Sequence, residues 1–147
     1  MVTMKLNKIP YEKIKSKSKI WEIRLNDDKR KSINIGDSIL FKKLPDCLEG
    51  FVAKVVDKKY FNTFEDISKV LDLKDVGFEE NANAQTCVDT YREYYSQEDE
   101  QKYGVVAFKL KLIWLCWIIK NSKNCFGAFF IYSFINFISP HSTSLYE

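Results

Sequence analysis

The sequence predicts an α+β fold, a small and mostly antiparallel β-barrel with about three flanking helices. Several short segments alternate apolar and polar residues, which is typical of half-buried strands. Apolar residues at helical spacing occur in separate stretches of the chain. The two kinds of segment do not follow the regular βαβ order that a parallel sheet requires. These patterns predict about five or six strands and three helices.

The chain is predicted to begin with an edge strand and a helix. Residues 4–6 favour a short strand, and Asn7 is placed to cap a helix that ends near Ser16. Pro10 falls in the first turns of this helix, where its missing N–H group is tolerated. Ile9, Ile14 and Tyr11 are expected to face the core.

The next segment, residues 19–25, is predicted to be a strand with two different faces. Side chains alternate between the faces of a strand. One face therefore carries Trp21, Ile23 and Leu25, and the other carries Ile20, Glu22 and Arg24. The turn-forming residues 26–28 end the strand.

The rest of the domain is predicted to hold two strands, two helices and a last strand. A Gly36-Asp37 turn leads into the first of these strands, and Thr63 with Asp66 resembles the capping box of the first helix. The segments, in order, are strands over residues 38–41 and 51–60, a helical stretch from residue 63 that Gly77-Phe78 breaks, a helix over residues 83–95, and a strand over residues 103–110. Cys87, Tyr91 and either Tyr94 or Tyr95 are expected on the buried side of the second helix, and residues 96–99 are expected to cap one more short turn.

The net charge permits a polyanionic partner without requiring one. The 147 residues include 23 Lys and Arg against 20 Asp and Glu, which gives a formal charge of +3. Residues 1–111 alone hold 21 basic and 19 acidic side chains. A nucleic-acid surface must therefore come from local clustering of charge. The candidate clusters are Lys29-Arg30-Lys31, Lys42-Lys43 and Lys58-Lys59, and the alternative is that they are scattered solubilising charges.

Cysteine and histidine usage predicts neither a metal site nor a cofactor. The chain has four Cys and one His, without a C-x-x-C pair, so the spacing of a zinc site is absent. The glycine pattern of a phosphate-binding loop is also absent. Met1 is followed by Lys5 and Lys8 without the apolar run of a signal peptide, which predicts a cytoplasmic protein.

Residues 112–147 are predicted to be an apolar, aromatic-rich tail that follows a domain at residues 4–111. The tail holds nine of the 22 aromatic residues. Its apolar blocks, residues 112–119 and 126–138, are each shorter than the ~20 residues that a bilayer span needs. Three interpretations stay open: the tail packs on the domain, it is an accidental extension of the reading frame, or it tethers a protein-interaction domain to a membrane. The oligomeric state is not predicted.

Lys19, Glu22 and Arg24 are the candidate functional residues of the predicted 19–25 strand. Strand geometry places Glu22 and Arg24 roughly 6.5–7 Å apart on one face, so that they can touch or grip one ligand. A guanidinium offers forked donors to a phosphate or a carbonyl edge, and a nearby carboxylate can orient it or act as a base. The alternative is an ordinary exposed ion pair worth ~0–1 kcal/mol.

The segment from Lys15 to Leu25, followed by Gly36-Asp37, resembles the signature of the ASCH domain, a family related to the PUA RNA-binding fold. The family motif is approximately Gly-x-Lys-x-x-Glu-x-Arg, and its charged positions match Lys19, Glu22 and Arg24. The resemblance covers about residues 4–111.

Two motif positions differ from the family pattern. Lys17 stands where the motif has glycine, and Ile20 stands where many members have threonine. Residues 94–105 are similar to the closing segment of bacterial members.

The resemblance implies a cleft beside the motif strand that binds RNA or a nucleotide. Arg24 and Lys19 are expected to contact phosphate or a base edge, and Glu22 to orient Arg24. The full set of expected ligand-binding residues is Lys17, Ser18, Lys19, Glu22, Arg24, Lys31 and Tyr103.

The alternative function that the resemblance implies is a hydrolase. Some relatives remove the acetyl group from N4-acetylcytidine, and ribonuclease activity has been assigned to another relative. In a hydrolase of this kind, Lys19 and Glu22 would be the catalytic residues. The catalytic threonine of the deacetylating relatives corresponds in position to Glu22.

Overall fold

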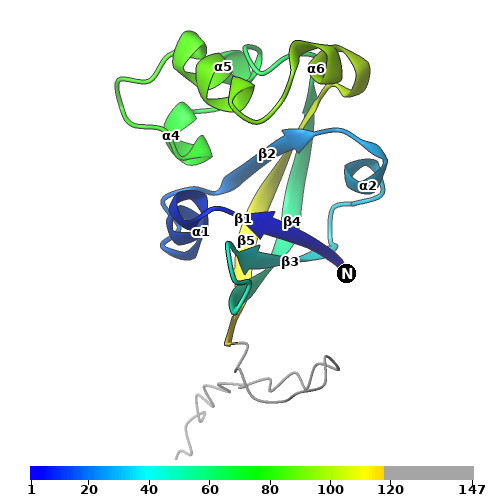
Figure 1. The fold of residues 1–147 in the computed structure, drawn as a ribbon, viewed down its shortest axis with the longest axis vertical. Helices are drawn as coiled ribbons and strands as arrows, with labels where there is room; N and C mark the ends of the chain where they lie inside the picture. The colour runs from blue at the N-terminus through cyan, green and yellow to red at the C-terminus, as the bar shows by residue number, and fades with distance from the viewer. Residues whose placement is uncertain (118–147) are drawn as a thin grey trace, which may run out of the picture.

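The computed structural model describes residues 1–117, which form one sheet and a set of short helices (Figure 1). The strands are β1 (Val2–Leu6), β2 (Trp21–Leu25), β3 (Ser38–Lys43), β4 (Glu49–Phe61) and β5 (Val105–Trp117). The helices are α1 (Lys8–Lys15), α2 (Asp28–Lys31), α3 (Ile67–Val70), α4 (Leu73–Val76), α5 (Ala84–Arg92) and α6 (Gln97–Tyr103).

The strands form one curled five-stranded sheet in the order β1-β3-β4-β5-β2. β1 runs parallel to β3, and the other three pairs are antiparallel. β1 and β2 are therefore the two edges, and the curl brings them to the same side of the molecule (Figure 1). The predicted α+β fold with a mostly antiparallel, partly closed barrel is confirmed.

The helices are more numerous and shorter than predicted. α2 and α4 are four residues long, and a single turn leaves no apolar periodicity to detect. Their starts are nevertheless encoded, because the side chains of Asp27 and Asp72 accept hydrogen bonds from the first turn. In α5, Asn83 and Thr86 form a reciprocal capping box.

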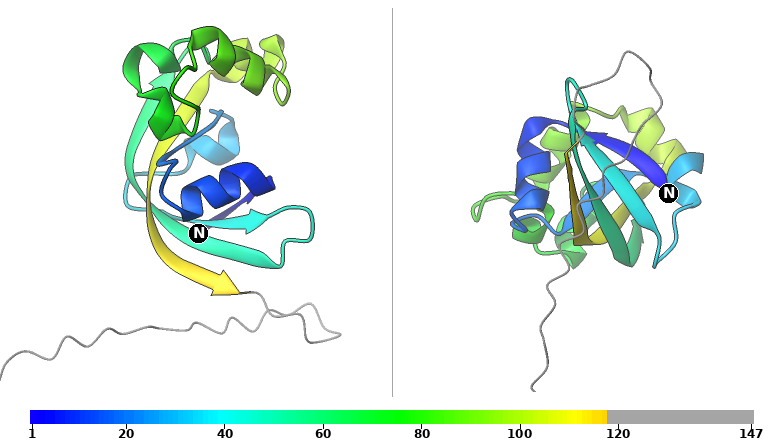
Figure 2. Two further views of the ribbon diagram at one scale, coloured as in Figure 1. Left: turned by 90° about the vertical axis from the view of Figure 1, so that its left-hand side faces the viewer. Right: turned by 90° about the horizontal axis from the view of Figure 1, so that it is seen from below.

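Two apolar cores lie on opposite faces of the sheet. On the concave face, where α1 lies inside the curl of the sheet (Figure 2), Tyr11 and Ile14 pack with Phe41, Phe51 and Phe108. This core explains the position of α1 inside the curl of the sheet, since burying each large side chain is worth about 1.5–3 kcal/mol. The expectation that Ile9 faces the core was wrong, because its side chain is 69% exposed on the outer side of α1.

The second core lies on the other face, where α3, α4 and α5 cover the β2 end of the sheet. Trp21, Ile23 and Leu25 belong to it, which confirms the predicted parity of the strand. Glu22 and Arg24 consequently point to the opposite side, toward the opening between the sheet edges.

The last strand extends further than predicted. β5 pairs with β4 from Val105, opposite Phe61, to Trp117, opposite Glu49, so the expected strand over residues 103–110 was too short. Residues 118–147 lie outside the described residues, and with them most of the predicted apolar tail. Within the described part of the chain, no helix has the length and hydropathy to cross a membrane.

Candidate ligand-binding pocket

A pocket of about 610 Å³ opens between the two edges of the curled sheet. Its walls come from the end of β1, the start of α1, the strand β2, the residues after α4 and the C-terminal end of α5. A volume of this size lies within the ~300–1,000 Å³ range of small-ligand sites. The pocket therefore occupies the seam that would be closed if β1 and β2 paired with one another.

Lys19, Glu22 and Arg24 form one connected charged group on the floor of this pocket. Lys19 Nζ lies 3.4 Å from Glu22 Oε2, and Arg24 Nε donates to Glu22 Oε1 at 2.8 Å. Glu22 and Lys19 are only 4% and 6% exposed. Two cations against one carboxylate leave the group with a net positive charge, which favours an anionic or carbonyl-bearing ligand.

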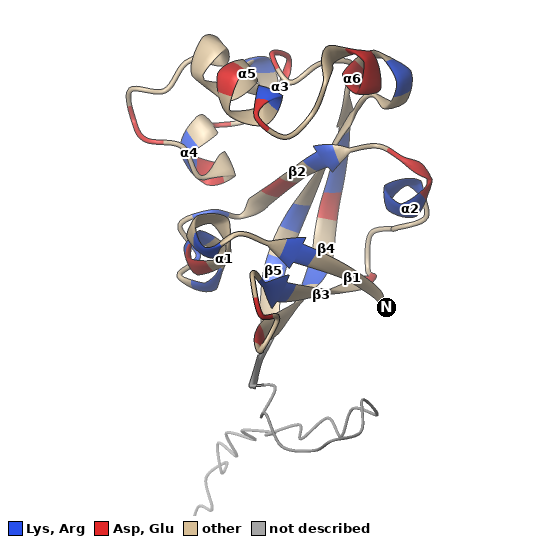
Figure 3. Cartoon of the chain, in the orientation of Figure 1, with Lys and Arg blue, Asp and Glu red and all other residues tan. Residues whose placement is uncertain are grey.

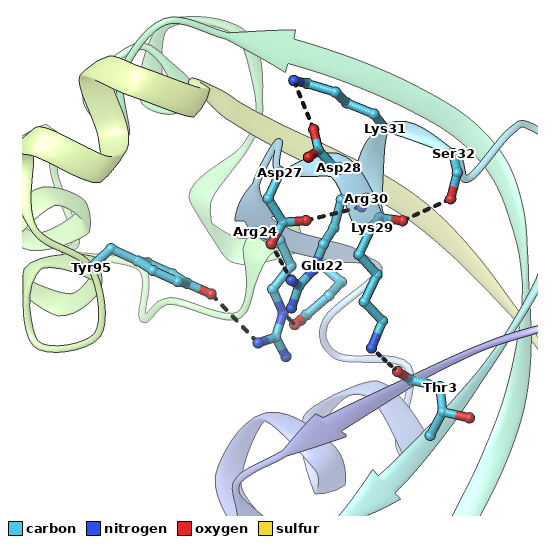
Figure 4. Close-up of polar contacts among 10 residues, drawn as sticks. All are labelled: Thr3, Glu22, Arg24, Asp27, Asp28, Lys29, Arg30, Lys31, Ser32 and Tyr95. Atoms are coloured by element: carbon cyan, nitrogen blue, oxygen red, sulfur yellow. Dashed lines mark hydrogen bonds and ion pairs between the residues drawn. The ribbon is translucent and has the colours of Figure 1, made fainter.

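Arg24 also joins the two edges of the sheet. Its Nη2 donates to the backbone oxygen of Lys5 at 2.9 Å, and its Nη1 lies 3.5 Å from the hydroxyl of Tyr95 (Figure 4). Burial alone would lower the pKa of Arg24, but Glu22 and Tyr95 outweigh this effect and the pKa is raised. The guanidinium is therefore a fixed positive charge, held in one orientation by β1, β2 and the turn that follows α5.

Lys19 is held by the residues that follow α4. Its Nζ donates to the backbone oxygen of Val76 at 2.7 Å. Gly77 has a φ of 98°, and a Cβ placed there would lie only 3.0 Å from Lys19 Cδ. Glycine at this position thus allows both the left-handed turn and the close approach of Lys19. Burial lowers the pKa of Lys19, against the opposing effect of Glu22.

Aromatic side chains form the wall above the charged floor. Phe64 stacks on Tyr91 at 4.7 Å and on Tyr95 at 5.6 Å between ring centroids, which fixes both tyrosines. Burial raises the pKa of Tyr91, so its hydroxyl stays protonated. Tyr94, by contrast, is 60% exposed at the mouth of the pocket. An exposed ring beside fixed cations is suited to stacking on a base.

The structure brings together three of the seven residues that the sequence predicted for ligand binding. Lys19, Glu22 and Arg24 line the pocket, whereas the other four do not. Ser18 instead donates to the Lys13 backbone oxygen at 3.2 Å, within the turn that precedes β2. Ser18 was predicted because it precedes Lys19 in the sequence, but its hydroxyl forms a hydrogen bond within its own turn.

Lys31 and Tyr103 lie away from the pocket for different reasons. Lys31 belongs to α2 and contacts Asp28 at 3.4 Å (Figure 4). Tyr103 ends α6, packs against the second core and has Lys102 over its ring. The basic triplet around Lys31 is tied to β1 instead, where Lys29 donates to the Thr3 backbone oxygen.

Lys17 explains one departure from the family motif. Its φ is 65°, in the left-handed region that glycine occupies without strain. The motif glycine is thus a conformational requirement of the turn before β2, and Lys17 adopts the same backbone conformation at a cost of about 1–2 kcal/mol. Its side chain is exposed outside the pocket.

The sequence prediction missed the residues that come from distant segments. Lys5, Gly77, Phe78 and the tyrosines in and just after α5 all line the pocket. The helical spacing over residues 83–95 indicated that tyrosines would be buried, but no local signal placed them against β2. The Gly77-Phe78 helix break was the one sequence feature that marked the α4 side of the site.

Other chemistry is not favoured by the described residues. Within residues 1–117, no three His, Cys, Asp or Glu side chains gather as metal ligands. Cys87 is buried, and burial raises the pKa of its thiol to about 11. A thiol with such a pKa is a packing group and a poor nucleophile at neutral pH.

The curled half-barrel with a charged pocket at its open seam defines the PUA-like class of fold. The chain belongs to the ASCH domain family, whose sequence profile matches residues 4–113. The predicted family is therefore confirmed. This family of PUA-like domains is often proposed to bind RNA.

Solved structures support the same assignment. The chain is similar to the crystal structure of hypothetical protein PH0355, with 31% identity, a TM-score of 0.67, and coverage of 76% of this chain and 97% of that one. It is similar to the solution structure of protein PF0455 from Pyrococcus furiosus, with 27% identity, a TM-score of 0.59, and coverage of 76% and 96%.

A third structure shows the shared fold alone. The crystal structure of an ASCH protein from Zymomonas mobilis has 14% identity and a TM-score of 0.52, with coverage of 74% of this chain and 65% of that one. No curated protein matches the chain.

Proposed function

We propose that this ASCH domain binds RNA or a nucleotide in the pocket between β1 and β2. The observation that carries the proposal is the Lys19–Glu22–Arg24 group, buried, net positive and facing an aromatic wall. Arg24 supplies fork-shaped donors for a phosphate or a base edge. Tyr94 supplies a face for stacking.

Glu22 has a positioning role in this proposal. One of its oxygens accepts from Arg24 and the other faces Lys19, so both of the pocket's deep cations are fixed by one carboxylate. The remaining N–H groups of the two cations are then directed at whatever enters the pocket. A ligand that places an acceptor oxygen on the floor and a flat ring against Tyr94 satisfies both features.

Filter binding of single-stranded RNA at two salt concentrations tests the proposal. Arg24→Ala is expected to weaken binding by more than about tenfold, as is typical when one partner of a charged contact is truncated. Since Arg24 also bridges β1 and β2, thermal unfolding of this variant must show that it is folded. Affinity that responds neither to salt nor to Arg24→Ala contradicts the proposal.

Tyr94→Ala provides a test that does not disturb the fold. Loss of one stacking contact is expected to weaken RNA binding by about 5- to 160-fold, which corresponds to roughly 1–3 kcal/mol. Tyr60→Ala is the matched control, because Tyr60 is also 60% exposed and does not line the pocket. Equal effects of the two substitutions contradict stacking at the pocket mouth.

A second candidate function is hydrolysis of a modified nucleoside. One observation favours it: Lys19 is buried, its pKa is lowered and it lies beside Glu22. Such perturbed groups in a pocket are candidates for acid–base chemistry. Incubation with N4-acetylcytidine, followed by chromatography for cytidine, checks this function. An absence of turnover, or equal turnover by Glu22→Gln, removes it.

A further inference from the structure

The face of the sheet that turns away from α1 carries a row of lysines. Trp21 faces this side, and Lys109 lies directly opposite Trp21 in the β2–β5 ladder. Opposite residues and residues two apart share a face, so Lys111 and its partner Lys54 lie on it as well. Lys59 joins them, since its Nζ and that of Lys109 lie 6.0 and 5.6 Å from the Trp21 ring centroid.

The same face continues across β3 to β1. Lys54 is paired with Ser38, which places Ser38 and, four residues on, Lys42 on this side. Lys42 is in turn opposite Lys5, the β1 residue at the rim of the pocket. Lysines therefore extend from β5 to the pocket along one face of the sheet, and Figure 3 shows basic positions on each of these strands.

Acidic residues are nearly absent from this face. Asp57, opposite Lys109 and 3.9 Å from Lys59, is the one acid that the described strand residues contribute to it. Lys54 and Lys111 form no ion pair within residues 1–117, although they lie opposite one another. Like charges directly opposite in a sheet reduce stability, so the fold itself gains nothing from this pair.

Several lysines off this face are neutralised by a nearby acid. Lys13, Lys43, Lys69 and Lys74 each contact a carboxylate. On the lysine-bearing face, by contrast, Asp57 near Lys59 is the one such contact among the described strand residues. A row of unneutralised lysines is complementary to a regularly spaced anion, and the phosphodiester backbone of a nucleic acid has that property.

We infer that this lysine face, defined as Lys5, Lys42, Lys54, Lys59, Lys109 and Lys111, holds the phosphate backbone of an RNA strand whose terminal or unpaired nucleotide enters the pocket. The inference rests on the proposed function and specifies its ligand as a single-stranded RNA of several nucleotides, of which a free nucleotide would occupy the pocket alone. Lys5 connects the two surfaces, because its side chain belongs to the face and its backbone oxygen accepts from Arg24.

The double substitution Lys54→Gln and Lys111→Gln tests this inference in the full chain. The probes are an RNA of about 20 nucleotides and a ribonucleoside monophosphate. We expect the plot of log binding constant against log salt concentration for the RNA to become less steep by about 1.4, because each lost phosphate contact removes about 0.7 from the slope. The RNA affinity is expected to fall at least fivefold. Mononucleotide binding is expected to stay unchanged, and the thermal midpoint to stay equal or rise.

Lys69→Gln with Lys74→Gln is the matched control, since both lysines are exposed on the helical side and the charge change is the same. Equal losses of RNA affinity in the two double variants, or an unchanged salt slope in the first, overturn the inference. Vesicles that contain phosphatidylserine form a third arm. Loss of vesicle binding without loss of RNA binding shows a lipid surface and also overturns it.

The outcome separates this inference from the proposed function. If Arg24→Ala weakens mononucleotide binding and the Lys54/Lys111 variant binds RNA normally, the pocket stands and the lysine face does not. If the Lys54/Lys111 variant loses RNA affinity and Arg24→Ala does not, the lysine face binds RNA and the proposed binding in the pocket is contradicted.

Discussion

The pocket floor and the lysine face belong to the same sheet but differ in whether their charged side chains are paired within the fold. On the floor, Lys19, Glu22 and Arg24 are buried and bonded to one another and to backbone oxygens. On the lysine face, Lys54 and Lys111 are exposed, opposite one another and without an acidic partner among the described residues. Charges that the fold itself holds together can therefore be distinguished from charges left for a partner.

The difference also explains how one strand serves two surfaces. β2 alternates its side chains, so Trp21 contacts lysines on one face while Glu22 and Arg24 line the pocket on the other. Removing a buried charge should thus disturb folding, whereas changing an exposed one should leave folding intact.

Glu22→Ala gives the largest expected effect. It leaves Lys19 and Arg24 buried without their carboxylate, and we expect the free energy of unfolding to fall by about 3–5 kcal/mol. Urea unfolding measures this change. Asp57→Ala is the control on the lysine face, where the loss should stay below about 1 kcal/mol. Similar losses at the two positions would remove the distinction between the surfaces.

Gly77→Ala is expected to have the next largest effect. The residue has a φ of 98°, and the added methyl group would press on the side chain of Lys19. Gly36→Ala is a close control, since its φ is 97° and nothing lies within 4 Å of the added Cβ. Both substitutions should cost about 1–2 kcal/mol from backbone strain, and Gly77→Ala should cost more. Equal losses in thermal stability would mean that contact with Lys19 is unimportant.

These comparisons show what sequence could and could not predict. The alternation over residues 19–25 placed Trp21 in the core and Glu22 with Arg24 on the opposite side, because strand parity is a local property. Lys5 and Tyr95 were not predicted, because only the curl of the sheet and the packing of α5 bring them to Arg24. The lysine face was predicted in part, since Lys42 and Lys59 belong to basic clusters that the sequence marked as candidates for a phosphate-facing surface. Its other members were not predicted, because the face is distributed over four strands.

Lys19→Met tests the protonation of the pocket floor. Burial lowers the pKa of Lys19 below its ordinary value of 10.5. Between the lowered pKa and 10.5, the unfolded chain binds a proton at Lys19 that the folded chain does not. The stability of the wild type relative to Lys19→Met should therefore rise with pH across this window and stay level below it.

Urea unfolding of both proteins over neutral to alkaline pH provides the measurement. A difference for Lys19→Met that falls as pH rises would contradict the burial of this ammonium group.

Lys54→Glu gives the smallest expected effect, and its sign is opposite to that of the pocket variants. It converts the pair with Lys111 into an ion pair across β4 and β5, so we expect stability to rise by about 0.2–1 kcal/mol while RNA affinity falls. Thermal unfolding and filter binding on the same sample show both changes. A loss of stability together with unchanged RNA affinity is the contrary result.

The most direct measurement of the central claim is an NMR titration of the full chain with a ribonucleoside monophosphate, following the Arg24 Nε–H signal. This proton is donated to Glu22 on the pocket floor, so a ligand there must alter its environment. The account predicts a saturable shift of the Arg24 Nε–H and of the Tyr91 and Tyr95 amides, with the Lys54 amide unchanged. Saturable shifts that leave Arg24 unmoved would contradict it.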